Sequence, residues 1–245
     1  MEEKILKNIE QEVRRGNAIA SEILWSNIFR DTIKNSKWLH NQPFSPGRAA
    51  IGYPTLYALY RILDEFQPRS ILEIGLGQST KMIGSYVKWK EKAQEECKHI
   101  VVEHDHTWID FFKNNFELSS QTEIMQMDLI KVNVTLGNGE KGDVNAYKEF
   151  KERLSEKNFD LIFIDGPFGS NPISRIDIMD LLPECINESF ILMLDDAGRY
   201  GEQNTLKMMT NKLRTNEIKF AQNYYSGEKY TAIITSQNLH FFCTM

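Results

Sequence analysis

Hydrophobic and polar positions follow one another along most of the chain in blocks that predict strands followed by helices. The predicted strands are the short apolar runs 70–74, 99–103, 122–127, 159–165 and 189–195. The predicted helices are the longer amphipathic segments 54–66, 78–97, 107–118, 146–158 and 174–186. The last two strands are continuously apolar, as expected of strands buried on both faces. Repeated strand–helix units of this length indicate an α/β fold with a Rossmann-like, doubly wound, mostly parallel sheet.

The last part of the chain has a different pattern. Two β-prone runs, 218–227 and 229–237, flank the turn Ser226-Gly227-Glu228, and no helix separates them. That arrangement predicts a hairpin, so the sheet should end in antiparallel strands.

The first 34 residues predict a helix with one apolar stripe. The stripe consists of Ile5, Ile9, Val13, Ile19, Ile23 and Leu24. We expect this helix to pack on the domain or on a second subunit, which makes a homodimer a reasonable expectation. A loop rich in proline and glycine follows, so we divide the chain into an N-terminal helical extension, 1–44, and an α/β domain, 45–245.

Composition narrows the class of protein. The chain has 245 residues, with 29 basic and 34 acidic side chains and a net charge of −5, which does not favour nucleic acid as a partner. The charged N-terminus lacks the apolar core of a signal peptide, and no apolar run is long enough to cross a bilayer. Three widely separated cysteines suggest neither a disulfide framework nor a zinc site. We therefore expect a cytoplasmic protein with no membrane partner.

The segment 70–84 predicts a strand, a sharp turn and the start of a helix, with Gly75 and Gly77 in the turn. A plain strand-to-helix turn is one interpretation. Gln78 stands where dinucleotide-binding loops often have a third glycine, so a pyrophosphate is less well accommodated. Glu73 would repel phosphate and suits a ligand with an amino group.

Two further acids follow neighbouring strands. Glu103 ends the run 99–103, where a carboxylate can accept hydrogen bonds from both ribose hydroxyls. Asp128 follows the run 122–127 and is placed to meet an adenine amino group. An adenosine with an amino-acid tail matches all three acids better than a dinucleotide does.

The motifs "ILEIGLGQST", "VVEHD", "MQMD" and "FDLIFIDGP", together with the terminal hairpin, resemble class I S-adenosylmethionine-dependent methyltransferases over about residues 45–235. The resemblance implies a seven-stranded sheet and S-adenosylmethionine as cofactor. It also departs from the family's pattern at Gln78 and in the wide gap between Glu73 and Glu103. The resemblance implies Glu73, Gly75, Gly77, Glu103 and Asp128 as cofactor-binding residues. We expect Gln78, Ser79, Thr80, His104 and Asp165 to line the same site.

Three acids follow the fourth and fifth predicted strands. Asp165, Asp195 and Asp196 match in position the acids of divalent-metal-dependent O-methyltransferases of the catechol type, although that type has Asn at the last position. The resemblance implies Mg²⁺ or another divalent cation held by these carboxylates. Two alternatives remain: Asp165 or Asp196 is a metal-free catalytic base, or the acids cap a turn and the next helix.

Four residues are candidates for binding the acceptor: Arg48, Tyr53, Arg175 and Arg199. An arginine can hold a phosphate or carboxylate through two hydrogen bonds, but each of these could equally be a solvated surface arginine.

The leading functional hypothesis is an S-adenosylmethionine-dependent methyltransferase acting on a hydroxyl of a small molecule or a sugar, including a glycan. A nicotinamide-dependent oxidoreductase is the alternative from another enzyme class, and it leaves Glu73 and the hairpin unexplained. A cofactor-binding partner without catalytic activity is the third.

Overall fold

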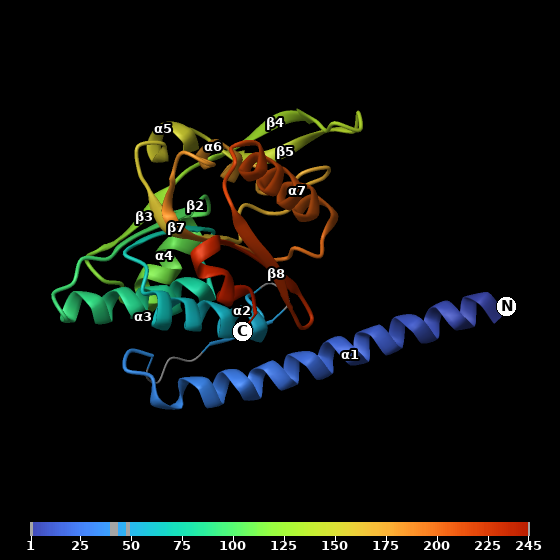
Figure 1. The fold of residues 1–245 in the computed structure, drawn as a ribbon, viewed down its shortest axis with the longest axis horizontal. Helices are drawn as coiled ribbons and strands as arrows, with labels where there is room; N and C mark the ends of the chain where they lie inside the picture. The colour runs from blue at the N-terminus through green and yellow to red at the C-terminus, as the bar shows by residue number, and fades with distance from the viewer. Residues whose placement is uncertain (1, 40–43, 48–49, 245) are drawn as a thin grey trace.

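The computed structural model describes residues 2–39, 44–47 and 50–244. Its centre is a seven-stranded sheet in the order β3-β2-β1-β6-β7-β9-β8 (Figure 1). The strands that run parallel are β1 (Ser70–Ile74), β2 (Lys98–Glu103), β3 (Thr122–Gln126), β6 (Phe159–Ile164) and β7 (Ile186–Leu194). The remaining two, β8 (Phe220–Ser226) and β9 (Tyr230–Ser236), form the hairpin, and β9 is antiparallel to β7. The predicted fold class and terminal hairpin are confirmed.

Helices cover both faces of the sheet (Figure 1). One face carries α2 (Tyr53–Arg61), its one-turn π-helical continuation η2 (Ile62–Phe66), α3 (Gln78–Lys92) and α4 (His106–Asn115). The other face carries α5 (Phe150–Leu154), α6 (Ile178–Leu181) and α7 (Tyr200–Thr215). A 3₁₀ segment, η3 (Gln237–Cys243), is the last element of the described chain. Successive strand residues such as Ile71 and Leu72 belong to different cores, because side chains alternate across a strand. The sheet is therefore buried on both sides, and its strand ends are the places left for a ligand.

Two predicted helices are wrong in extent. Residues 129–147 form an antiparallel hairpin, β4 (Leu129–Thr135) and β5 (Lys141–Tyr147), where no strand was predicted, and the helix predicted over 146–158 is reduced to α5. Val134 and Val144 pack with Ile173, and this long-range contact stabilises a hairpin that the local pattern did not predict.

The helix predicted over 174–186 is reduced to α6. Arg175 has a positive φ of 58°, which a right-handed helix does not allow, and Pro183 stops the helix on the other side. The left-handed backbone at Arg175 therefore interrupts the predicted helix.

The N-terminal helix α1 (Glu2–Thr32) is followed by a 3₁₀ turn, η1 (Ile33–Asn35). Its second half lies against the domain, where Ser21 Oγ and Trp25 Nε1 donate hydrogen bonds to the Ser226 carbonyl, at 2.9 and 3.1 Å. Its first half extends beyond the domain (Figure 1). Among the described residues, no helix combines the length and hydropathy that a bilayer crossing requires.

Candidate active site

The chain reverses its direction of winding between the neighbouring strands β1 and β6, so a crevice is expected beyond their carboxyl ends. Gly75 begins the loop after β1 with a φ of +105°, which favours glycine. A Cβ there would lie 3.0 Å from the backbone of Asp165 and Gly166, so this loop and the loop after β6 are in close contact. A Cβ on Gly77 would meet no atom within 4 Å. The glycine loop therefore leaves open space above Gly77.

Glu73 lies under this loop and is completely buried. One oxygen accepts a hydrogen bond from Ser79 Oγ, and the other lies 3.1 Å from His99 Nε2. His99 Nδ1 in turn lies 3.3 Å from Thr122 Oγ1. The carboxylate predicted to line the methionine end of the cofactor thus has both oxygens engaged by protein groups, and it supports the loop from below.

The first turn of α3 is also held by side chains predicted to bind the cofactor. Thr80 Oγ1 accepts a hydrogen bond from the Gly77 amide at 2.9 Å, and Gln78 Oε1 accepts one from the Ser45 amide at 3.2 Å. Thr80 is buried, whereas Gln78 is half-buried and ties the loop before α2 to the glycine loop.

Glu103 ends β2 at the rim of the crevice. Its carboxylate accepts hydrogen bonds from the amides of Leu76, His104 and Asp105 at 3.0, 2.7 and 3.0 Å. These three donors fix its position between the ends of β1 and β2. The exposed ring of Phe168 lies 5.6 Å from the ring of His104, so the loop after β6 reaches across to the end of β2.

Asp128 lies farther out. It follows β3 with an exposed side chain, and its carbonyl accepts a hydrogen bond from the Lys148 amide at 2.8 Å. Its place at the end of the outermost parallel strand is the one that the sequence predicted.

The structure brings together the three acids Asp165, Asp195 and Asp196. One carboxylate oxygen from each lies within 4.8 Å of the others. Asp165 follows β6 and the other two follow β7, so parallel pairing of these strands places all three at one edge of the sheet.

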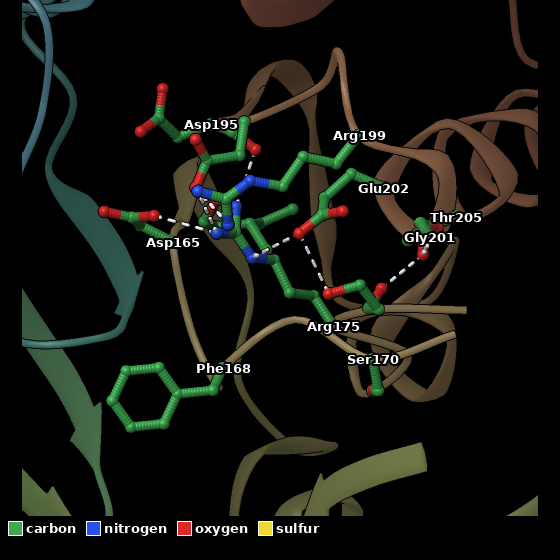
Figure 2. Close-up of polar contacts among 12 residues, drawn as sticks. Asp165, Phe168, Ser170, Arg175, Asp195, Arg199, Gly201, Glu202 and Thr205 are labelled. Carbon is green, nitrogen blue, oxygen red and sulfur yellow. Dashed lines mark hydrogen bonds and ion pairs between the residues drawn. The ribbon is translucent and has the colours of Figure 1, made fainter. Parts of the chain in front are cut away.

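Cations contact each of these acids, and Figure 2 shows Arg175 and Arg199 beside them. Arg175 Nη2 lies 3.0 Å from Asp165 Oδ1 and 3.1 Å from Asp196 Oδ2. Lys229 Nζ lies 3.1 Å from Asp195 Oδ2 and 3.2 Å from Asp196 Oδ1. Two cations therefore bridge the three carboxylates in pairs.

Arg175 was a candidate for binding the acceptor, but its side chain is only 3% exposed. It donates to the carbonyls of Ile164 and Asp195 at 3.1 and 2.6 Å, and its Nε lies 3.7 Å from Glu202 Oε1. Ser174 Oγ also donates to Glu202 Oε1, at 3.0 Å. Arg175 is thus a buried clamp for the acids.

Lys229 and Glu202 were not predicted from the sequence. Lys229 lies in the turn between β8 and β9, and Glu202 lies in the first turn of α7. Nothing in their local sequence distinguishes them from solvated surface charges. Arg199, in contrast, was a candidate, and it lies 2.9 Å from Asp196 Oδ2 with a half-exposed side chain.

The acids as arranged do not fit a divalent cation. Asp195 is completely buried, and its Oδ1 accepts a hydrogen bond from Thr231 Oγ1 at 2.7 Å while its Oδ2 faces Lys229. Both Asp196 oxygens face cations. Arg175, Lys229 and Arg199 would repel a divalent cation placed among these acids. The same three side chains already balance the negative charge of the carboxylates.

Asp165 differs from the other two acids. Its Oδ1 contacts Arg175, whereas its Oδ2 has no protein donor among the described residues and points away from the cluster (Figure 2). Burial and the charge of Asp195 raise the pKa of Asp165 to about 7, although Arg175 opposes the shift. The group can therefore exchange a proton near neutral pH.

A cleft of about 680 Å³ opens beside Asp196. The loop before α2, the segment after β7, the β8–β9 turn and α1 form its walls. Its lining includes two acceptor candidates, Tyr53 and Arg199, together with Lys229 and, from α1, Arg15 and Glu22. Arg48, the fourth acceptor candidate, lies outside the described residues.

No protein-family model matches the chain, and no curated protein matches it. Among solved structures, the O-methyltransferase NovP superposes with a TM-score of 0.51 and 11% identity, over 74% of this chain and 79% of that one. A methyltransferase from Pyrococcus furiosus has a TM-score of 0.47 and 15% identity, over 87% of this chain and 96% of that one. At these identities the likeness concerns the fold, and the chain has the Rossmann-like fold of class I S-adenosylmethionine-dependent methyltransferases.

Proposed function

We propose that this protein is an S-adenosylmethionine-dependent methyltransferase that methylates a hydroxyl of a small molecule or a sugar. The observation that carries the proposal is the position of Asp165 at the end of β6. Arg175 anchors one of its carboxylate oxygens and the other oxygen faces away from the cluster, while burial raises the pKa of the carboxyl group to about 7. An oxygen acceptor needs such a base, because an alcohol is a weak nucleophile until its proton is removed.

The crevice beyond β1 and β2 suits a nucleoside cofactor. Open space above Gly77 allows close approach to the backbone, and Glu103 is held rigidly where ribose hydroxyls would donate hydrogen bonds to its remaining lone pairs. When bound, S-adenosylmethionine supplies an electrophilic methyl group. The exposed Phe168 ring, next to His104, can cover the ligand and limit the entry of water.

Asp165 and Asp196 have different roles in the proposed reaction. Asp165 accepts the proton of the acceptor hydroxyl at Oδ2, while Arg175 fixes its orientation through Oδ1. Asp196 positions Arg175 and Arg199, because both of its oxygens are engaged by cations. No divalent cation is part of the proposed reaction.

The acceptor binds in the cleft beside Asp196. Its mixture of charged and hydroxyl groups suits a polar molecule such as a sugar better than an apolar one. Tyr53 and the half-exposed Arg199 are the residues of this cleft best placed to contact the acceptor.

Calorimetry with S-adenosylhomocysteine and with NAD tests the cofactor. Binding of the first and not of the second supports the proposal, and the reverse supports the oxidoreductase. The matched variants are Glu103→Gln, expected to weaken binding at least tenfold, and Glu123→Gln on β3, expected to change nothing.

Methyl transfer from labelled S-adenosylmethionine to a panel of sugars and phenols tests the reaction. We expect turnover that is unchanged after treatment with EDTA. Activity that disappears with EDTA and returns with Mg²⁺ would overturn the metal-free assignment, and cofactor binding without transfer to any acceptor would favour a catalytically inactive partner.

A further inference from the structure

The first half of α1 exposes large apolar side chains. Ile5, Leu6, Ile9 and Val13 are between 52% and 60% exposed. Ser21 and Glu22, in the second half of α1, form polar contacts with the domain: Ser21 Oγ donates to the Ser226 carbonyl, and Glu22 accepts hydrogen bonds from the amides of Tyr53 and Glu228. Several turns of apolar helix surface therefore face solvent in a single chain.

Exposed apolar residues of α1 form one seam with the spacing of a coiled coil. Leu6, Ile9, Val13, Gly16, Ala20 and Ile23 follow one another at alternating intervals of three and four residues, and all are exposed. Apolar positions at this spacing are typical of helices that pair along their length.

The seam lies on the side of α1 that faces away from the domain. Ala18, Glu22 and Phe29 point towards the domain or its cleft. At 100° per residue, the mean direction of the seam differs from theirs by about 180°. The helix can therefore hold a partner on one face and the domain on the other without competition.

The charges of this segment do not favour a lipid surface as the partner. The first fifteen residues carry four acidic side chains and four basic ones, so they have no net charge. Helices that lie on anionic membranes have an excess of Lys and Arg on the polar face.

The seam is complementary to itself in an antiparallel arrangement. A two-fold axis between Val13 and Gly16 would place Val13 opposite Gly16 of a second copy, Ile9 opposite Ala20 and Leu6 opposite Ile23. Each of the first two pairs joins a large residue to a small one, and the third joins two large residues at the ends. A parallel pair in register would instead place glycine opposite glycine and leave a gap.

We propose that two copies of the chain form a symmetric dimer through antiparallel pairing of α1 along the seam formed by Leu6, Ile9, Val13, Gly16, Ala20 and Ile23. The pairing closes on itself, so each seam is used once and no filament results. Because Arg15 and Glu22 on the same helix line the cleft, the dimer also holds one wall of that cleft in place.

Light scattering of the full chain, at concentrations of tens of micromolar, tests the dimer. We expect wild type and Gln11→Glu, a substitution on the other face of the same helix segment, to be dimers, and Ile9→Glu to be monomeric. All three should share one thermal midpoint for the α/β domain, because residue 9 lies beyond it. A monomeric wild type, or a dimeric Ile9→Glu, would overturn the proposal.

Cysteine crosslinking tests the direction of pairing. Antiparallel pairing predicts an efficient disulfide between subunits in the double variant Leu6→Cys/Ile23→Cys and little in either single variant. Efficient crosslinking of Leu6→Cys alone would indicate parallel pairing and overturn the geometry. Calorimetry of S-adenosylhomocysteine binding to Ile9→Glu tests the proposed function separately from the dimer. We expect Ile9→Glu to bind as wild type does, since the crevice does not involve the seam.

Discussion

His99 Nε2 lies 3.1 Å from Glu73 Oε2, and neither side chain is exposed to solvent. This buried pair connects β2 to the strand that carries the glycine loop, and Ser79 extends it into the first turn of α3. The loop is therefore held from below by a polar relay whose members must all find partners, because an unpaired polar group is costly at such a site.

Replacing His99 with Phe should loosen the glycine loop. The substitution removes a donor from buried Glu73, so we expect a loss of about 2 kcal/mol of unfolding free energy and weaker binding of S-adenosylhomocysteine. Chemical denaturation and calorimetry measure the two effects. Thr122→Val, at the outer end of the relay, should have a smaller effect on both, and an unchanged affinity in His99→Phe would show that the relay does not shape the loop.

Removing Arg175 should destabilise the protein strongly. Arg175→Met leaves Asp165, Asp196 and Glu202 without their shared buried cation, and breaking a buried pair from one side costs about 3–5 kcal/mol. Arg199→Met removes a half-exposed partner of Asp196 and should cost less than about 1 kcal/mol. Urea denaturation of both variants checks the difference, and equal costs would contradict the role of Arg175 as the clamp.

The rate of methyl transfer should rise with pH through the pKa of Asp165. The base works only when it is ionised, and its pKa is raised to about 7, so activity should be low at pH 5.5 and level off above about pH 8. Asp165→Asn should lower kcat by at least about 100-fold and remove this rise. A profile in Asp165→Asn that still rises near pH 7 would identify another group as the base.

Asp177 should make stability depend on pH. Burial raises the pKa of this carboxyl from 3.8 to about 7, so the folded state binds more protons than the unfolded state between these values. The free energy of unfolding must then fall as the pH rises through this range and stop falling above it. Asp177 Oδ1 accepts a hydrogen bond from the Tyr147 amide at 2.7 Å, and an asparagine retains that acceptor.

Asp177→Asn should therefore gain stability relative to wild type as the pH rises from 4 to 8, by a few kcal/mol. Asp110→Asn, at an exposed position in α4, is the control and should follow wild type. Parallel curves for wild type and Asp177→Asn would show that Asp177 does not titrate in this range.

Local patterns of the sequence were sufficient to predict the sheet and where its chemistry lies. Continuous apolar runs identified β6 and β7, and the pair of β-prone runs around Gly227 predicted the antiparallel end of the sheet. Because parallel strands present their carboxyl ends at one edge, Asp165, Asp195 and Asp196 had to meet. These conclusions depend on the pattern of apolar and polar residues over a few positions, which can be read directly from the sequence.

Only the tertiary structure decided which groups the acids contact. Arg175 reaches them through a left-handed backbone position, and Lys229 arrives from the β8–β9 turn, which the antiparallel pairing of β9 with β7 places at the same edge of the sheet. The hairpin of β4 and β5 formed where no strand was predicted for a similar reason, since Ile173 packs against it from another part of the chain. Charge compensation and core packing depend on where distant segments meet in space. The spacing of residues along the chain does not predict these long-range contacts.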